Sequence, residues 1–215
     1  MKRICLLSVL LVCIFCQAET LDTCFISEPI PDSVFLRMKG KSYKANCTVP
    51  RSELRYLRLS YCDGTGKTQT GEMVCNKAIA KDLVCIFREL WKAGYRIEKM
   101  QLIDEYDADD QRSMEANNTS CFNFRTISGT STISKHGRGM AIDINPLYNP
   151  YVYTRGGVQK IEPKGGKKWA YHRNTRKDIP YKIDEEDLCY KLFRQHGFRW
   201  GGSWRTGKDY QHFEK

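Results

Sequence analysis

The sequence predicts an α+β fold in which helices flank a mostly antiparallel central sheet. Runs with strand periodicity and runs with helical periodicity both occur, and they do not alternate in the regular order that would build a parallel sheet. The length, 215 residues including an N-terminal leader, suits one compact domain and is marginal for two. We therefore expect a single α+β domain.

The strand signals are short and scattered along the chain. Residues 57–61 alternate apolar with polar side chains, which is the period-two pattern of a half-buried strand, and a turn follows at residues 63–64. Strand-like runs also occur at residues 97–103, 140–144 and 211–214.

Two segments carry helical spacing. The clearer one lies between Asn76, a suitable N-cap, and Gly94, a suitable stop. The second is predicted to begin at Asp184, because a run of acidic residues complements the positive end of a helix, and to end at Gly197. In that helix Leu188 is expected to face the core.

The N-terminus has the features of an export signal. A positively charged start, an apolar run over residues 4–15 and a small residue at Ala18 predict a signal peptide of residues 1–18 and a mature domain of residues 19–215. The apolar run is shorter than the roughly 20 residues that span a bilayer, and no later segment is apolar enough. The predicted location is periplasmic, cell-envelope or secreted, with a lipid-modified leader cysteine as the alternative.

The cysteine pattern argues against cysteine chemistry. The mature chain keeps an odd number of cysteines, so at least one is unpaired, and no C-x-x-C pair of the zinc-ribbon kind occurs. One or two disulfides among the early cysteines remain open, whereas Cys85 and Cys189 lie in helical apolar patterns and are expected to pack as small hydrophobes. The mature cysteines are Cys24, Cys47, Cys62, Cys75, Cys85, Cys121 and Cys189.

Positive charge is concentrated in one segment. Removal of Lys2 and Arg3 with the leader lowers the formal net charge from +10 to +8, and residues 145–182, with nine basic and two acidic residues, carry +7 of it. We expect this segment, hereafter the basic segment, to be a long loop that attracts an anionic polymer. A solvated loop with incidental charge is the alternative.

The histidines suggest a metal site. His136 precedes Asp143 in a glycine-rich context that leads into a strand-like run, and Asp209 precedes His212 in an aromatic context. Two imidazoles and one carboxylate meet the needs of a catalytic zinc, which keeps one position open for water. A further carboxylate beside that position could take the proton of the water.

The order of motifs adds a family resemblance. The pattern S-x-H-x-x-G-x-A-x-D over residues 134–143, followed by D-x-x-H over residues 209–212, resembles the zinc D-alanyl-D-alanine carboxypeptidases and L-alanyl-D-glutamate endopeptidases of bacteria. Further similar blocks lie at residues 113–125 and 200–204, and the resemblance covers roughly residues 36–215. It implies a fold like that of hedgehog domains and DD-peptidases.

The resemblance also implies roles for individual residues. One zinc per chain would be held by His136, Asp143 and His212, and Asp209 would be the general base. Many relatives have glutamate at the position of Asp209, so the reach of this shorter side chain needs to be tested.

Two more residues receive roles from the resemblance. Arg125 would polarise the scissile carbonyl and stabilise the oxyanion, and Ser134 would help to hold the substrate. From the residues alone, the less favoured alternative is a structural ion pair of Arg125 with Asp109 or Asp110.

The implied function is an exported zinc metallopeptidase that cuts peptidoglycan stem peptides, as a D-Ala-D-Ala carboxypeptidase or an L-Ala-D-Glu endopeptidase. The expected partners are stem peptides and anionic cell-wall polymer, not nucleic acid, and the expected state is a monomer. The alternative is a catalytically silent zinc-binding module for wall binding or signalling, because the same scaffold resembles the hedgehog signalling domain.

Overall fold

The computed structural model describes residues 24–215, so the predicted signal peptide lies outside the described residues. The strands form three three-stranded sheets, in which every strand pair is antiparallel. The α+β class and the antiparallel pairing are thus confirmed, although three small sheets replace the single central sheet that was expected. Among the described residues, no helix has both the length and the apolarity to cross a bilayer.

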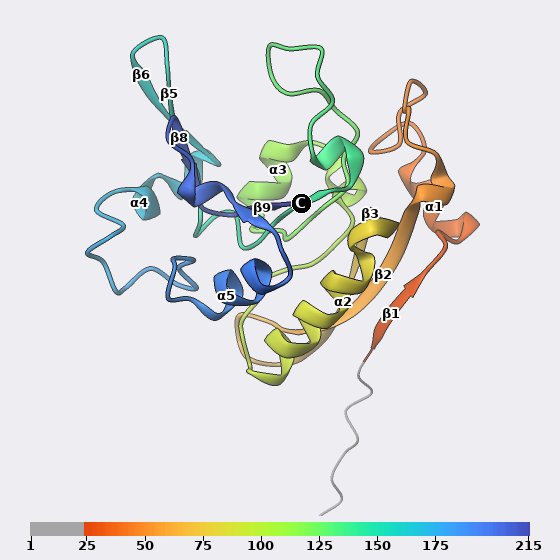
Figure 1. The fold of residues 1–215 in the computed structure, drawn as a ribbon, viewed down its shortest axis with the longest axis horizontal. Helices are drawn as coiled ribbons and strands as arrows, with labels where there is room; N and C mark the ends of the chain where they lie inside the picture. The colour runs from red at the N-terminus through yellow and green to blue at the C-terminus, as the bar shows by residue number, and fades with distance from the viewer. Residues whose placement is uncertain (1–23) are drawn as a thin grey trace, which may run out of the picture.

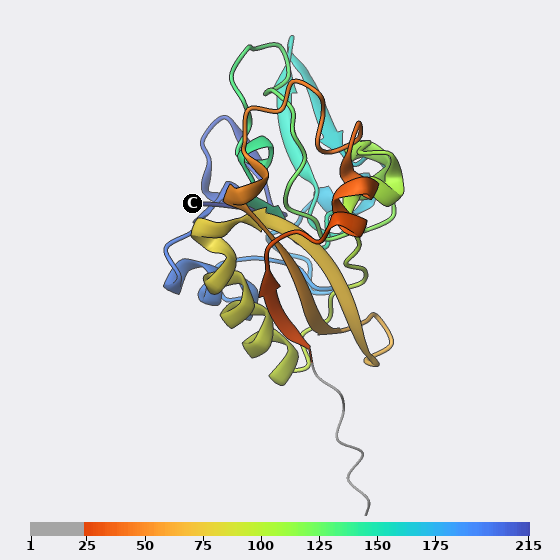
Figure 2. The same cartoon turned by 90° about the vertical axis from the view of Figure 1, so that its right-hand side faces the viewer.

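The first sheet has the order β1-β2-β3 and supports helix α2. It consists of β1 (Phe25–Glu28), β2 (Leu54–Cys62) and β3 (Thr68–Asn76), and α2 (Lys77–Lys92) lies across one of its faces (Figures 1 and 2). The predicted strand at residues 57–61 is therefore the middle of β2, and the turn at residues 63–64 joins β2 to β3.

Helix α2 has the boundaries that its sequence predicts. The Asn76 side chain accepts a hydrogen bond from the backbone N–H of Ala78 at 3.0 Å, and Gly94 follows the helix with φ of +66°. The apolar face of α2 packs on β2, where Leu57 and Leu59 are fully buried. The buried residues of the helix are Ile79, Ala80, Leu83, Ile86, Phe87 and Leu90.

The other two sheets are built from the second half of the chain. Their orders are β4-β9-β7 and β6-β5-β8. Their strands are β4 (Ala141–Asp143), β5 (Tyr151–Arg155), β6 (Val158–Glu162), β7 (Arg199–Trp200), β8 (Gly207–Asp209) and β9 (His212–Glu214). The remaining α-helices are α1 (Asp32–Met38), α3 (Asp110–Glu115), α4 (Lys167–Ala170) and α5 (Leu188–Gln195), and the 3-10 helices are η1 (Arg51–Glu53), η2 (Ile103–Tyr106), η3 (His136–Arg138), η4 (Lys164–Gly166) and η5 (Gly201–Ser203).

Two of the three short strand-like runs are strands. Residues 140–144 contain β4 and residues 211–214 contain β9. The strand expected at residues 97–103 is wrong, because this segment makes only an isolated bridge from Lys99 to Asn118. Its apolar residues Ile97 and Met100 are nevertheless buried, so their apolar character reports core packing and not sheet pairing.

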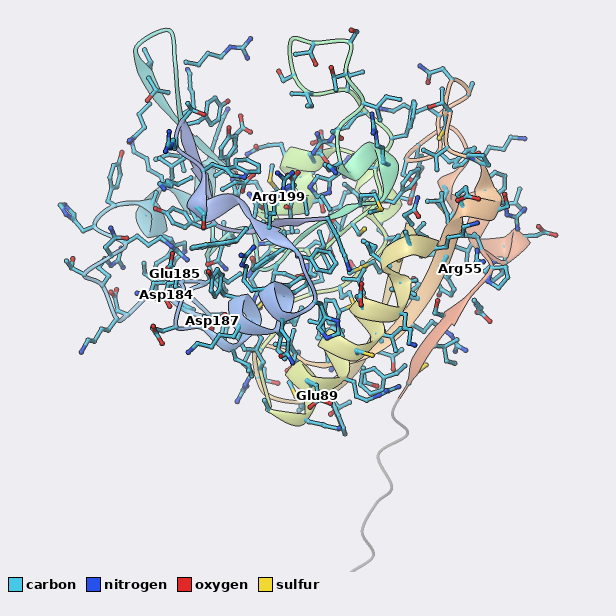
Figure 3. All side chains as sticks on the ribbon, in the orientation of Figure 1. Arg55, Glu89, Asp184, Glu185, Asp187 and Arg199 are labelled. Carbon is cyan, nitrogen blue, oxygen red and sulfur yellow. The ribbon has the colours of Figure 1, made fainter. Side chains whose placement is uncertain are left out.

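Helix α5 starts four residues later than expected. The helix begins at Leu188, after Asp187, whose side chain accepts a hydrogen bond from the backbone N–H of Cys189 at 3.0 Å. Asp184, Glu185 and Asp187 lie together in the segment that precedes the helix (Figure 3). Leu188 is 37% exposed, so its predicted place in the core is also wrong. The helix ends as expected before Gly197, where φ is +82°.

The basic segment is not one long loop. It contains the β5–β6 hairpin and the short helix α4. Its charge is also not all on the surface, because the guanidinium of Arg173 is buried and donates to the carbonyl oxygen of Tyr148 and to the side chain of Asn149. Burial lowers the pKa of Arg173 to about 10.

All seven cysteines of the described residues are free thiols, so the disulfides that were left open among the early cysteines do not occur in this structure. Cys189 is fully buried, as expected, whereas Cys85 is half-exposed.

The cap of α5 makes a prediction about stability. Burial raises the pKa of Asp187 from 3.8 to about 6. Between pH of about 4 and 6 the folded chain therefore keeps a proton that the unfolded chain has lost, and the stability that this proton supplies is lost as the pH rises. Asp187→Asn keeps an N-cap and cannot ionise, so we expect it to stabilise the fold by roughly 1–3 kcal/mol at pH 7.

Urea denaturation at several pH values checks this prediction. The gain in the free energy of unfolding should be small at pH 4, grow up to about pH 6 and then level off. A gain that is the same at every pH would contradict it, because a change of packing alone does not follow the ionisation of Asp187.

Candidate metal centre

Strand pairing brings the first two predicted ligands together. Asp143 at the end of β4 stands opposite His212 at the start of β9 in an antiparallel register, so their side chains lie on the same face. Their neighbours Ile142 and Phe213 are fully buried on the other face. The ligand pair therefore points away from the core, and Asp143 Oδ1 lies 3.1 Å from His212 Nδ1.

The third predicted ligand, His136, is held by a tight turn. The hydroxyl oxygen of Ser134 accepts a hydrogen bond from the backbone N–H of Gly137 at 2.9 Å, which closes the turn around η3. Gly139 has φ of +68°, and a Cβ there would lie 2.7 Å from the backbone nitrogen of Asn76. Only glycine fits this conformation and this close approach, so the glycine of the motif fixes the path of the chain after His136.

The three side chains converge on one point. His136 Nε2 lies 3.1 Å from His212 Nδ1 and 3.3 Å from Asp143 Oδ1. Among residues 24–215, these three residues form the group whose ligand atoms all lie within 4.8 Å of one another. The sequence thus identified a set that the fold does bring together.

Hydrogen bonds behind the imidazoles orient them toward this point. His136 Nδ1 lies 2.8 Å from the carbonyl oxygen of Cys121, which can only accept, so the hydrogen sits on Nδ1 and the lone pair of Nε2 faces the cluster. His212 Nε2 lies 3.4 Å from Glu214, leaving Nδ1 for the cluster. Glu214 in turn accepts from Arg199 at 2.6 Å. Such outer partners are what metal-binding histidines ordinarily have.

Sequence reasoning missed Glu214. A signal was available, because residues two apart in a strand share a face, and Glu214 follows His212 by two positions in a predicted strand. The carbonyl of Cys121 could not have been found in this way, because it is a backbone group from a distant loop.

The charges around the imidazoles favour a cation. Burial alone would lower the pKa of His212, but its hydrogen bonds with Asp143 and Glu214 outweigh burial and raise that pKa to about 10. Burial likewise opposes ionisation of Asp143, yet the contacts with His136 and His212 keep the pKa of Asp143 well below its ordinary value. A metal ion could take the place of the proton that this cluster holds.

Asp209 lies at the end of β8, just before the ligand strand β9. Its Oδ1 atom is buried and has no hydrogen-bond partner among the described residues. Burial, reinforced by the charge of Asp143, raises the pKa of Asp209 to about 7. Gly201 makes room here, since a Cβ at Gly201 would lie 2.8 Å from the Cβ of Asp209 and 3.2 Å from that of His212. A buried carboxylate without a partner is suited to exchange a proton.

Arg125 is engaged by a neighbouring acid in this structure. Its Nε contacts a carboxylate oxygen of Asp110, and both side chains are about one-third exposed. Asp109 has a different task, because its side chain caps α3 by accepting from the backbone N–H of Arg112 at 3.0 Å. Of the two ion-pair partners considered from the sequence, Asp110 is therefore the one that is used.

The other two histidines of the sequence have different surroundings. His196 lies at the end of α5, and its Nδ1 is 3.1 Å from Oδ1 of Asp82 in α2. His172 is exposed. Trp200 is packed in the core, whereas the half-exposed Trp204 lies 5.2 Å from the ring of His212.

Comparison with known proteins agrees with this site. Residues 128–215 match the family model described as D-alanyl-D-alanine carboxypeptidase. No curated protein and no solved structure matches the chain. The matched range includes Ser134, the three clustered residues and Asp209, whereas Arg125 lies outside it. The resemblance predicted from the motifs is thereby confirmed over residues 128–215, which are similar to that family.

Proposed function

We propose that this chain is an exported zinc peptidase that hydrolyses an amide bond in peptidoglycan stem peptides. The observation that carries the proposal is the convergence of His136, Asp143 and His212, together with the buried and unpartnered Oδ1 of Asp209. The bond is either D-Ala-D-Ala at the end of the stem or L-Ala-D-Glu near the sugar.

The residues present fit a zinc ion. Two imidazoles with oriented lone pairs and one ionised carboxylate are a typical catalytic ligand set, and three protein ligands leave a position open. When bound, zinc supplies Lewis acidity, which activates water and stabilises negative charge on the carbonyl oxygen.

Asp209 is proposed to carry the proton through the reaction. Its unpartnered Oδ1 would accept a proton from the attacking water, and the same oxygen would return that proton to the leaving amine. Asp209 is absent from the group of ligand atoms, which agrees with a base that stands beside the metal and does not bind it.

Arg125 and Ser134 keep their proposed roles in substrate binding. The contact with Asp110 would hold the guanidinium of Arg125 in one orientation, from which it could donate to the oxyanion. The oxygen of Ser134 accepts a bond inside the turn, so its hydroxyl hydrogen stays available to donate to a substrate.

Mass spectrometry of sacculi treated with the purified protein tests the proposal and identifies the bond. Loss of terminal D-alanine would indicate a carboxypeptidase, and release of stem peptides beginning with D-glutamate would indicate an endopeptidase. Intact muropeptides in the presence of stoichiometric zinc would instead support the silent zinc-binding module.

The first prediction from this proposal concerns metal content. We expect about one zinc per chain in the wild type and loss of most of it in His136→Ala, since one of three ligands is removed. His196→Ala is the matched control, because His196 pairs with Asp82 away from the cluster. Elemental analysis that finds equal zinc in both variants would refute the ligand assignment.

The second prediction separates the base from the ligands. Asp209→Asn should retain zinc and lose turnover by roughly 100-fold or more, because the amide cannot accept the proton. Asp143→Asn should lose zinc, since it removes the anionic ligand. If the two variants lose zinc equally, Asp209 is a ligand and the base must be sought elsewhere.

The third prediction concerns the basic segment. Its exposed lysines should attract anionic wall polymer through a field that salt screens over ~8 Å at physiological ionic strength. Replacing three of them by glutamine should therefore weaken binding to sacculi and flatten its salt dependence, while hydrolysis of a small uncharged stem-peptide analogue should hardly change. The replaced residues are Lys164, Lys167 and Lys168.

A control triple variant removes the same charge from exposed lysines outside the basic segment. It should bind sacculi more tightly than the first variant. Equal losses in both variants would mean that only net charge matters. The control residues are Lys44, Lys67 and Lys92.

A further inference from the structure

Two tyrosines of the β5–β6 hairpin share a face with the proposed base. In the sheet β6-β5-β8, Tyr151 stands opposite Asp209, and Tyr153 stands opposite Gly207. Residues paired in this way have side chains on the same face, and residues two apart in one strand do as well. The face that carries Asp209 therefore also carries both tyrosine rings.

Aromatic contacts connect this face with the metal cluster. The ring centroids of Tyr151 and Tyr153 are 4.5 Å apart with the planes inclined by 22°, so the two rings are stacked. Tyr151 meets Trp204 edge to face at 6.4 Å, and Trp204 lies 5.2 Å from the ring of His212. A continuous path of rings thus runs from a ligand histidine to the hairpin.

These rings are not core residues. Tyr151, Tyr153 and Trp204 are all half-exposed, and they lie outside both hydrophobic core clusters of the described residues. The hairpin also projects from the body of the protein (Figures 1 and 2). Gly207 lets the two rings pack closely against β8, because a Cβ there would lie 3.0 Å from the Tyr151 ring and 3.2 Å from the Cβ of Tyr153.

We propose that Tyr151 and Tyr153 form a subsite for the sugar of the peptidoglycan substrate; this inference rests on the proposed function. The C–H bonds on one face of a sugar ring pack on the negative face of an aromatic ring. The neighbouring strand β6 adds polar groups on the same face: Lys160 stands opposite Tyr153, and Glu162 stands opposite Tyr151 and accepts a hydrogen bond from the Tyr153 hydroxyl at 2.8 Å. A platform continuous with the cluster makes a sugar-linked peptide a better substrate than a free peptide.

The distances suit a substrate that is cut near its sugar. Each step from His212 through Trp204 to Tyr151 is shorter than 7 Å, and an extended residue spans about 3.5 Å, so roughly three residues or fewer would connect the cluster to the platform. The subsite therefore favours the L-Ala-D-Glu bond over the distal D-Ala-D-Ala bond.

The test compares two substrates, a muropeptide that carries its disaccharide and the same stem peptide without sugar. The wild type should have a higher kcat/KM for the muropeptide. Tyr153→Ala should reduce this preference at least tenfold, chiefly through KM, because Tyr153 lies two residue pairs further from Asp209 than Tyr151 does. Tyr171→Ala is the control, since Tyr171 is 45% exposed and lies outside the platform, and it should keep the full preference.

A binding measurement keeps this inference separate from the proposed function. Calorimetry with the disaccharide alone, using Asp209→Asn with and without Tyr153→Ala, needs no turnover. Sugar binding that depends on Tyr153 supports the subsite even if no hydrolysis is observed. That combination would contradict the proposed function and not the subsite.

Other results would overturn the subsite. One is equal loss of kcat/KM for both substrates in Tyr153→Ala, together with a loss of zinc, because the rings would then serve only to support Trp204 and His212. Another is sugar binding that is the same with and without the Tyr153 ring.

Discussion

The antiparallel register of β4 with β9 is the constraint on which the site depends. It sets Asp143 opposite His212 and buries Ile142 and Phe213 on the reverse face. Phe213 stacks on Phe193 of α5 at 4.3 Å, so core packing holds the strand in this register. A slip by one residue would turn the ligands into the core and the phenylalanine toward solvent, which makes the register costly to change.

The position of His136 depends on a different contact, between the metal turn and the first sheet. The backbone N–H of Asn76 donates to the carbonyl oxygen of Gly139 at 2.8 Å, and the side chain of Asn76 donates to Arg138 while it also caps α2. One residue thus joins the end of β3, the start of α2 and the turn that carries His136. The best-formed helix of the chain and the metal cluster therefore share a single junction.

Helix boundaries and turns that depend only on neighbouring residues could be predicted from the sequence. The cap and the stop of α2 were readable because Asn76 and Gly94 act on their own neighbours. The start of α5 was misread because several acidic residues precede it, and only Asp187 has the geometry of a cap. The β5–β6 turn had a readable signal in Gly156-Gly157, whose φ angles are +58° and +74°, although the basic residues around it suggested a loop.

The pairing of strands that lie far apart in the sequence could not be predicted from neighbouring residues. The clustered residues His136, Asp143 and His212 could be predicted because a motif order marks them, whereas the tyrosine face beside them arises from the pairing of β5 with β8. Nothing in either three-to-five-residue strand specifies that partner, since such short strands are stabilised by cross-strand contacts that exist only after folding.

The segment of residues 207–214 connects the β5–β6 hairpin with the cluster of His136, Asp143 and His212. Its first strand, β8, pairs with the hairpin, and its second, β9, pairs with the ligand strand β4. Asp209 ends the first and His212 begins the second, so two residues separate the proposed base from a ligand. A displacement of the hairpin would therefore reach Asp209 through β8 before it reached the ligands, which core packing at Phe213 holds in place. The proposed base Asp209, and not the cluster of His136, Asp143 and His212, is therefore the part of this centre most directly coupled to the tyrosine face.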